Sequence, residues 1–183
     1  IDLPDYKILK NYKPPVLSRV YSGEGQLIAE YASQKRLFIP FDAVPKKVIN
    51  AFLSAEDKNF FKHPGIDAKS ITRAIIKNIN NILEDKRLEG ASTITQQVAK
   101  NFLLSNEVSI KRKIKEAILS FRIEKAYTKE RIMELYLNQI YLGQGVYGVA
   151  AASLEYFDKS VNELNHEEVA LLAALPKAPS KYN

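Results

Sequence analysis

Apolar residues recur at every third or fourth position from residue 44 to the end of the chain, and this period predicts helices almost throughout. In the first predicted helix, Pro45 suits the first turn, where a missing N–H leaves nothing unsatisfied, and Pro64-Gly65 ends the helix. One face of this helix is formed by Val48, Ile49, Phe52, Leu53 and Phe60. We therefore expect a mainly α-helical fold.

Glu56 lies near the middle of this apolar face, because successive helical residues turn by ~100° about the axis. A carboxylate directed at a protein core is costly unless a partner or a function compensates for it. Two interpretations remain open: an ion pair with a buried Arg or Lys, and a carboxyl group that moves a proton. Asp57 and His63 are expected to gather beside Glu56 at the C-terminal end of the helix.

The composition narrows the class of protein. Of the 183 residues 46% are hydrophobic, enough for one domain with a packed core and a small lobe. The net charge of +6 favours an anionic partner, such as nucleic acid, a membrane surface or a phosphorylated substrate. The absence of cysteine excludes disulfides and thiol catalysis. No apolar run approaches the ~20 residues of a membrane span, and we interpret the chain as part of a longer protein.

Residues 1–43 are predicted to form a separate N-terminal segment. Residues 1–15 are polar and end in Pro14-Pro15, and we expect them to be an extended lead-in. Two candidate strands, residues 17–21 and 27–31, flank a glycine-containing turn and predict a short β-hairpin. Residues 44–183 then form the helical domain, with a small lobe around residues 71–90.

A second helix is expected after Asp67, whose carboxylate can cap its N-terminus. Its apolar stripe consists of Ile71, Ile75, Ile79 and Ile82. The segment 75–88 is amphipathic and has basic residues beside the isoleucines. Core packing is the first interpretation of this stripe, and a surface helix that dips into a bilayer is the alternative.

Uncharged polar side chains are concentrated on one face of a third predicted helix. The buried row of this helix is expected to be Ile94, Val98 and Phe102. The opposite face carries Thr93, Gln97, Lys100 and Asn101. Hydroxyl and amide groups suit hydrogen bonds to sugar hydroxyls, and Ser92, at the predicted start of the helix, suits a phosphate.

The helix predicted at residues 109–127 carries a cluster of charges. It is expected to be capped by Ser109 and to pack inward through Ile110, Ile114, Ala117, Ile118 and Phe121. Lys113 and Glu116 are three residues apart and therefore neighbours on one face. They can form an ordinary surface ion pair or, together with Arg112, present positive charge to a pyrophosphate.

Two further helices are marked by their caps. Thr128 is the predicted cap of one, with Glu130 in its first turn. Asn165 and Glu168 form a predicted capping box for the last helix, which Pro176 ends and which we interpret as scaffold. Between them lies a glycine-containing loop at residues 143–148, which lacks the Lys-Ser/Thr of a phosphate-binding loop.

Four motifs, in this order, resemble signatures of the peptidoglycan glycosyltransferase domain of class A penicillin-binding proteins and monofunctional transglycosylases. They are EDKNFFKHPG at residues 56–65, GASTITQQ at 90–97, RKIKE at 112–116 and KERIMELYLN at 129–138. The resemblance covers roughly residues 40–183. Many members have Gly where this chain has Ala91, a small change that affects nothing catalytic.

The resemblance implies a lysozyme-like helical domain with a smaller membrane-facing lobe. It implies polymerisation of lipid II into glycan strands, with inversion at the anomeric carbon and release of undecaprenyl pyrophosphate. Glu56 would be the general base that deprotonates the acceptor 4-hydroxyl. Lys113, Arg112 and Lys100 would neutralise the leaving pyrophosphate, and Glu116 would hold Lys113 or position the donor.

The site residues implied by the resemblance fall into two groups. The catalytic group is Glu56, Glu116 and Lys113. The substrate-binding group is Asp57, His63, Ser92, Thr93, Gln96, Gln97, Lys100, Asn101, Arg112 and Asn138. A divalent cation, Mg²⁺ or Mn²⁺, is a further expectation: Asp57 would bind it or would instead orient Glu56, and the residues do not choose between these roles. No organic cofactor is expected.

The implied partners are lipid II, the growing lipid-linked glycan and an anionic membrane surface, with no nucleic acid. The implied location is the outer, periplasmic face of the bacterial cytoplasmic membrane, to which the full-length protein would be anchored. The chain has no SxxK motif, so any penicillin-reactive transpeptidase domain would lie C-terminal to it in the full-length protein. Inhibitors of the moenomycin type would compete with the donor.

Two other classes of function remain as alternatives. A lysozyme-like hydrolase would also use one prominent Glu in a helical fold, but it has no need of the basic cluster at residues 112–115. A helical module that binds nucleic acid or an anionic membrane would explain the charge. It would leave Glu56 and the polar face of residues 92–101 without a purpose.

Overall fold

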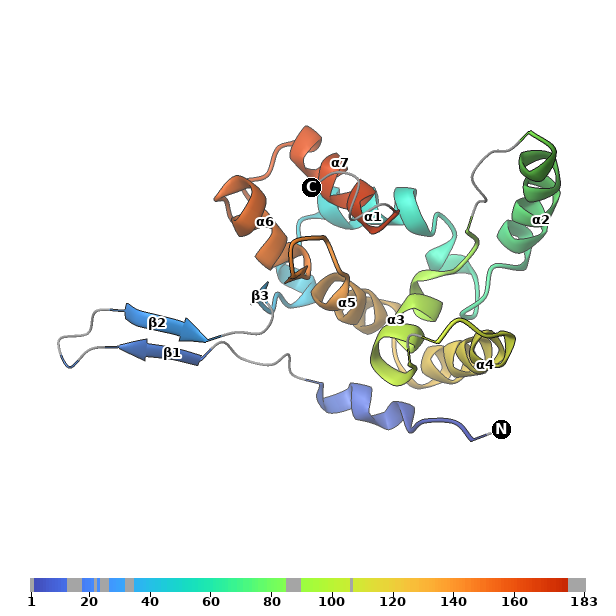
Figure 1. The fold of residues 1–183 in the computed structure, drawn as a ribbon, viewed down its shortest axis with the longest axis horizontal. Helices are drawn as coiled ribbons and strands as arrows, with labels where there is room; N and C mark the ends of the chain where they lie inside the picture. The colour runs from blue at the N-terminus through green and yellow to red at the C-terminus, as the bar shows by residue number, and fades with distance from the viewer. Residues whose placement is uncertain are drawn as a thin grey trace. The chain divides into compact units, whose positions relative to one another are not determined.

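The computed structural model describes residues 2–12, 18–21, 23, 27–31, 35–84, 90–105 and 107–177. Within these ranges the chain is mainly α-helical, so the predicted fold class is confirmed (Figure 1). None of the helices in these ranges is both long enough and apolar enough to cross a membrane.

The chain divides into two compact units that are interleaved along the sequence. One contains residues 1–9 and 53–133, and the other contains residues 10–52 and 134–183. The boundaries between these units therefore differ from the predicted boundary between residues 1–43 and 44–183. The division falls within two helices, α1 (Lys46–Glu56) and α5 (Lys129–Gln139).

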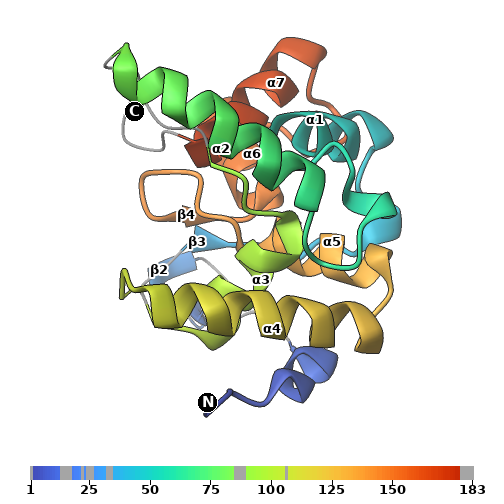
Figure 2. The same ribbon diagram turned by 90° about the vertical axis from the view of Figure 1, so that its right-hand side faces the viewer.

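The unit built around residues 53–133 contains three complete helices: α2 (Ala68–Leu83), α3 (Ile94–Leu103) and α4 (Ile110–Ala126). Helices α3 and α4 pack side by side, as both views of the ribbon show (Figures 1 and 2). The 3-10 turn η3 (Phe60–Lys62) follows α1, and Phe60 in this turn is fully buried. The predicted caps Asp67 and Ser109 are confirmed, since each side chain accepts a backbone N–H of the first helical turn.

The other unit contains the N-terminal hairpin and two complete helices, and it shares α1 and α5 with the first unit. The hairpin strands β1 (Ser18–Tyr21) and β2 (Leu27–Tyr31) are antiparallel and confirm the predicted hairpin. Two helices complete the unit, α6 (Val149–Phe157) and α7 (His166–Ala174), and the capping box of Asn165 with Glu168 starts α7 as predicted. The last turn, η4 (Leu175–Lys177), follows directly.

Three predictions about secondary structure are wrong. The lead-in is not wholly extended, because η1 (Tyr6–Asn11) is a 3-10 helix; Pro14-Pro15 lies outside the described residues. The residues after 44 are not all helical or loop, because β4 (Val146–Tyr147) pairs in parallel with β3 (Lys35–Arg36). The first helix ends at Glu56 and does not run on to Pro64.

The predicted inward face of α4 is also wrong. Ile110 is 82% exposed, and Ile114 and Phe121 are exposed as well. The buried face is Glu116, Leu119, Ser120 and Ile123. The apolar pattern is misleading here because two polar residues of the buried face find their partners inside the unit. Ser120 Oγ donates to the Glu116 carbonyl at 2.7 Å, and the Glu116 carboxylate pairs with cations.

Helix α2 does not use its isoleucines for core packing, so the first interpretation of its stripe is wrong. Ile79 is 56% exposed and Ile82 is 67% exposed, and Ile75, Ile76 and Leu83 are exposed too. Ala74 and Asn81 are the buried residues of this helix. A shallow groove of about 570 Å³ runs along it, lined by Ile76, Asn80 and basic side chains. Residues 85–89 of the predicted lobe lie outside the described residues.

Candidate active site

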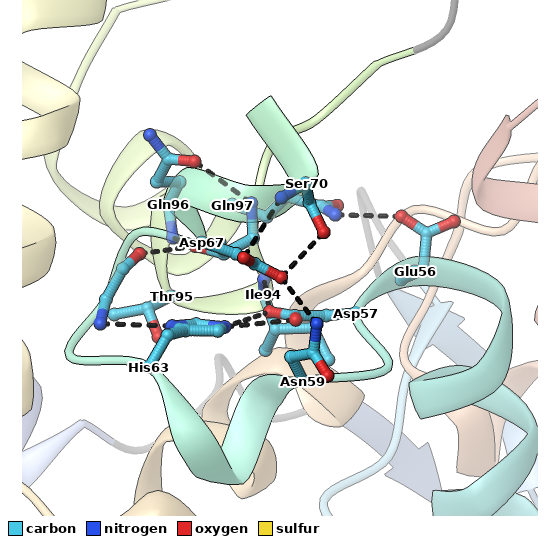
Figure 3. A network of polar contacts seen from close by, with 12 residues as sticks. Glu56, Asp57, Asn59, His63, Asp67, Ser70, Ile94, Thr95, Gln96 and Gln97 are labelled. Carbon is cyan, nitrogen blue, oxygen red and sulfur yellow. Dashed lines mark hydrogen bonds and ion pairs between the residues drawn. The ribbon is translucent and has the colours of Figure 1, made fainter. Parts of the chain in front are cut away.

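Glu56 is the last residue of α1 and is half-buried. Its Oε2 atom accepts a hydrogen bond from Nε2 of Gln97 on α3, at 2.8 Å (Figure 3). The other carboxylate oxygen, Oε1, is shielded from solvent and makes no hydrogen bond to any described residue. Glu56 forms no ion pair with the described residues, so the ion-pair interpretation of this carboxylate is not supported.

Asp57, the residue that follows Glu56, contacts His63, and both are buried. The ring Nε2 atom of His63 is 3.0 Å from each carboxylate oxygen of Asp57. Oδ2 of Asp57 also accepts the backbone N–H of Ile94 at 3.0 Å. These contacts occupy both oxygens of the carboxylate, and the described residues contain no group of three or more His, Asp or Glu side chains that could hold a metal ion. The role of Asp57 as a metal ligand therefore stays a prediction.

Asp67, the cap of α2, belongs to the same loop region (Figure 3). Its Oδ2 atom accepts hydrogen bonds from Asn59 Nδ2 at 2.8 Å and from Ser70 Oγ at 2.6 Å, and Oδ1 accepts the Ser70 N–H at 3.1 Å. Burial acts to raise the pKa of Asp67, but the hydrogen bonds from Ser70 and Asn59 outweigh it and lower the pKa to about 2. The carboxylate is thus held ionised, which suits a helix N-terminus.

The N-terminus of α3 is held by a capping box. Thr93 Oγ1 accepts the N–H of Gln96 at 3.1 Å, and Gln96 Oε1 accepts the N–H of Thr93 at 3.0 Å. Thr93 Oγ1 also donates to the carbonyl of Gly65 at 2.6 Å. Both side chains are buried, so their polar atoms serve the helix cap. On the same helix Gln97 is half-buried, while Lys100 and Asn101 are exposed.

Ser92, Arg112, Lys113 and Glu116 form a charged cluster between the start of α3 and α4. The carboxylate of Glu116 is almost completely buried, with 2% of its side chain exposed, and it pairs with both cations: Oε2 with Arg112 Nη1 at 3.1 Å, and Oε1 with Lys113 Nζ. Lys113 Nζ also donates to Ser92 Oγ at 2.8 Å. Two cations around one carboxylate leave a net positive charge, and the Lys113 side chain is 47% exposed.

The structure therefore brings together most of the predicted site residues but not all of them. Glu56, Gln97 and the Ser92 cluster all belong to the unit of residues 53–133. Asn138 belongs to the other unit, where its side chain is buried and occupied by backbone groups. Its Oδ1 accepts the N–H of Ile39, and its Nδ2 donates to the carbonyls of Ile39 and Glu134, each at 2.8 Å.

Sequence reasoning missed a second layer of polar residues in the same unit. Glu124 Oε1 accepts hydrogen bonds from Thr95 Oγ1 at 2.5 Å and from Lys129 Nζ at 2.7 Å. Lys129 Nζ also donates to the His63 carbonyl at 2.8 Å and lies 4.4 Å from the centre of the Phe60 ring. The signal was present in the motif at residues 129–138, which begins with this lysine, but spacing alone gave it no partner.

Comparison with known proteins identifies the family of the chain. The family model described as Transglycosylase matches residues 24–183. The chain therefore belongs to the transglycosylase family, which makes it an enzyme of the peptidoglycan glycosyltransferase class, and the resemblance noted from the sequence motifs is confirmed.

Individual relatives share a single name. Penicillin-binding protein 1A of Rickettsia felis is 58% identical over 182 residues, a match that covers 100% of this chain and 23% of the relative. The protein of the same name from Aquifex aeolicus is 52% identical, with 100% and 25% covered. A crystal structure of penicillin-binding protein 1A from Haemophilus influenzae aligns with a TM-score of 0.43 at 26% identity, covering 100% of this chain and 16% of that one. The chain thus spans about a quarter of the length of these curated relatives.

Proposed function

We propose that the chain polymerises lipid II, adding disaccharide units to a glycan that is carried on undecaprenyl pyrophosphate. The observation that carries this proposal is the state of the Glu56 carboxylate. One oxygen is oriented by the neutral amide of Gln97, and the other has no hydrogen bond within the described residues. A carboxylate that is oriented but not neutralised by a cation retains a lone pair that can accept a proton.

In the proposed reaction, Glu56 takes the proton of the acceptor 4-hydroxyl while that oxygen bonds to the donor's anomeric carbon. The bond between this carbon and the pyrophosphate oxygen breaks on the opposite side, so the configuration inverts. The electron pair of the broken bond goes to the pyrophosphate. One base therefore suffices, because the leaving group departs as an anion and needs no proton.

The leaving pyrophosphate requires positive charge that is already in position. Lys113 meets this requirement, because Ser92 and Glu116 hold its ammonium group on two sides. Arg112 is held by the same carboxylate, which leaves its charge in place at the start of α4. Glu116 is then the residue that positions both cations. Cations that are ordered during folding need no reorganisation when the reaction occurs, which lowers the barrier.

We derive no step through a divalent cation. Both oxygens of Asp57 accept hydrogen bonds from His63 and Ile94, so a metal at this position would have to displace contacts that are already made. In this proposal, Lys113 and Arg112 neutralise the negative charge that develops on the pyrophosphate. Exposed Lys100 on α3 is a further cation for this role.

The proposed setting is the outer face of the bacterial cytoplasmic membrane. The exposed isoleucines of α2 and the basic side chains beside them, Lys69, Arg73 and Lys77, suit a helix that lies in the surface of an anionic bilayer. This is the alternative interpretation of the isoleucine stripe. The curated relatives are about four times as long as this chain, which leaves room for the proposed transpeptidase domain in a full-length protein.

Incubation with lipid II in vesicles, followed by separation of the products by length, tests the proposal. We expect lipid-linked glycan chains and free undecaprenyl pyrophosphate. Shortening of added glycan strands, with no use of lipid II, would instead indicate a hydrolase. Lys113→Ala should reduce use of the lipid-linked donor by the loss of a charge-assisted contact, about 1.5–3 kcal/mol. Lys125→Ala, on an exposed lysine in the last turn of α4, is the matched control.

A further inference from the structure

Two contacts join the end of α1 to the start of α3. Asp57 directly follows Glu56, and its N–H still closes the last turn of α1 by donating to the Leu53 carbonyl at 2.9 Å. Its carboxylate accepts the N–H of Ile94, the first residue of α3, at 3.0 Å. Gln97, three residues further along α3, donates to Glu56. The orientation of the Glu56 carboxylate thus depends on how α3 is attached to Asp57.

His63 fixes the direction of the Asp57 carboxylate. Its ring Nδ1 accepts the N–H of Gly65 at 3.2 Å, so Nδ1 carries a lone pair and the hydrogen of the neutral ring is on Nε2. That Nε2–H points to Asp57, 3.0 Å from both oxygens (Figure 3). Each polar atom of the His63 ring therefore has a partner, and the ring is buried.

The loop that carries His63 is itself held in place from two sides. The Gly65 carbonyl accepts Thr93 Oγ1 at 2.6 Å, which ties the loop to the cap of α3. Lys129 Nζ donates to the His63 carbonyl at 2.8 Å. Gly65 has φ +103, and a Cβ at this position would lie 2.9 Å from the backbone of Ser120 on α4. The imidazole is thus presented to Asp57 by a loop that cannot easily move away.

We propose that Asp57 and His63 are a positioning pair for Glu56, and that neither contacts substrate. His63 orients the Asp57 carboxylate, Asp57 holds the first turn of α3, and α3 holds Gln97 at hydrogen-bonding distance from Glu56. This inference rests on the proposed role of Glu56 as the general base. It assigns to both residues a role other than the substrate binding or metal binding expected from the motif at residues 56–65.

Two substitutions of His63 separate the two contacts of its ring. In His63→Gln, the side-chain NH₂ reaches the place of Nε2 and can still donate to Asp57, while the acceptor for Gly65 is lost. In His63→Asn, the shorter side chain can offer its oxygen to the Gly65 N–H, while the donor to Asp57 is lost. Each variant gives up one hydrogen bond, so both are expected to lose similar stability. Only the asparagine variant frees the Asp57 carboxylate.

The expected result is a difference in turnover between the two variants. His63→Asn should lower kcat on the order of 10²-fold with KM for lipid II unchanged, because a misplaced base affects the reaction and not substrate binding. His63→Gln should retain most of the wild-type kcat. The same pair of substitutions at exposed His166, the first residue of α7, is the control and should change neither constant. A rise in KM for both His63 variants would show that the ring contacts substrate and would overturn the proposal.

Nuclear magnetic resonance of the ¹⁵N-labelled protein gives a readout that does not depend on activity. The wild-type His63 ring should be protonated on Nε2 and not on Nδ1; the opposite tautomer would refute the inference. The Gln97 side-chain amide signals should shift in His63→Asn toward their positions in Glu56→Gln, and should stay near the wild-type positions in His63→Gln. If both variants unfold, the tautomer of the wild-type His63 ring still tests whether His63 donates to Asp57.

The two proposals fail in different ways. If Glu56→Gln polymerises lipid II at the wild-type rate, Glu56 is not the base and the proposed function is wrong. If Glu56→Gln is inactive while His63→Asn and His63→Gln have equal kcat and equal Gln97 spectra, the base assignment stands and the positioning role is refuted.

Discussion

Replacing Glu56 with Gln is the most informative single change, because the structure predicts a small effect on stability and a large loss of turnover. The new side chain keeps the shape of Glu56, and its carbonyl oxygen can accept the same hydrogen bond from Gln97. No cation of the described residues pairs with Glu56, so the substitution leaves no charge unpaired. The free energy of unfolding should therefore change by no more than about 1 kcal/mol, the worth of one altered hydrogen bond.

Turnover should behave quite differently. An amide cannot accept the proton of the acceptor hydroxyl, and loss of a general base lowers rates by about 10²–10⁴-fold. Both quantities can be measured on one sample, by thermal unfolding followed by circular dichroism and by lipid II consumption at saturating substrate. Glu56→Asp, which keeps the charge but shortens the side chain, is the matched control for the base itself and should keep more activity than Glu56→Gln.

Two outcomes would refute the reasoning. A loss of about 3–5 kcal/mol in Glu56→Gln, the cost of breaking a buried ion pair, would mean that a cation pairs with this carboxylate after all. Wild-type turnover in a stably folded Glu56→Gln variant would remove Glu56 from the reaction.

Three further predictions concern the surroundings of the site. The pKa of Asp67 is lowered to about 2 in the folded protein, so its ionised form stabilises the fold above pH 4, and this contribution is lost as pH falls from about 4 to 2. The difference in unfolding free energy between wild type and Asp67→Asn, at most about 2 kcal/mol, should therefore shrink over that range when unfolding is measured in an acid titration. Gly65→Ala should destabilise by roughly 2 kcal/mol or more in denaturant unfolding, because of its positive φ and the Ser120 backbone, whereas Gly90→Ala, which meets nothing within 4 Å, should not. Replacing Ile79 and Ile82 with Asp should release the protein from anionic vesicles in flotation assays without loss of helical signal, since both side chains are exposed; unfolding would show that they are core.

The sequence predicted the helices better than the faces that they bury. Caps are local, so Asp67, Ser109 and Asn165 could be recognised from the residues that follow them. Burial is decided by what the rest of the chain offers. On α4 the isoleucines at 110 and 114 attract attention, but the face that packs includes Glu116, whose burial is possible only because Arg112 and Lys113 lie within one turn of it.

Only part of the site could be predicted, because some of its contacts depend on residues that are distant in the sequence. Glu56 was identified from its place in an apolar face, and the structure gives that carboxylate a neutral partner, Gln97. The motif could not show that Asp57 and His63 bind each other, since a contact between residues six apart depends on the turn between them. Lys129 lies 66 residues from the His63 carbonyl that it binds, and no periodicity in one sequence reports such a pairing.

The exposed apolar face of α2 has a practical consequence for handling the protein. Five large aliphatic side chains on one helix form an exposed hydrophobic patch. A second copy of the protein, a detergent micelle or a column matrix can each cover it. The apparent mass of the purified chain should therefore vary with detergent and protein concentration. A dimer seen by size-exclusion chromatography without detergent would show that two copies cover this patch in solution. Only a dimer that persists in the Ile79→Asp variant, and so does not depend on the patch, would bear on assembly in the cell.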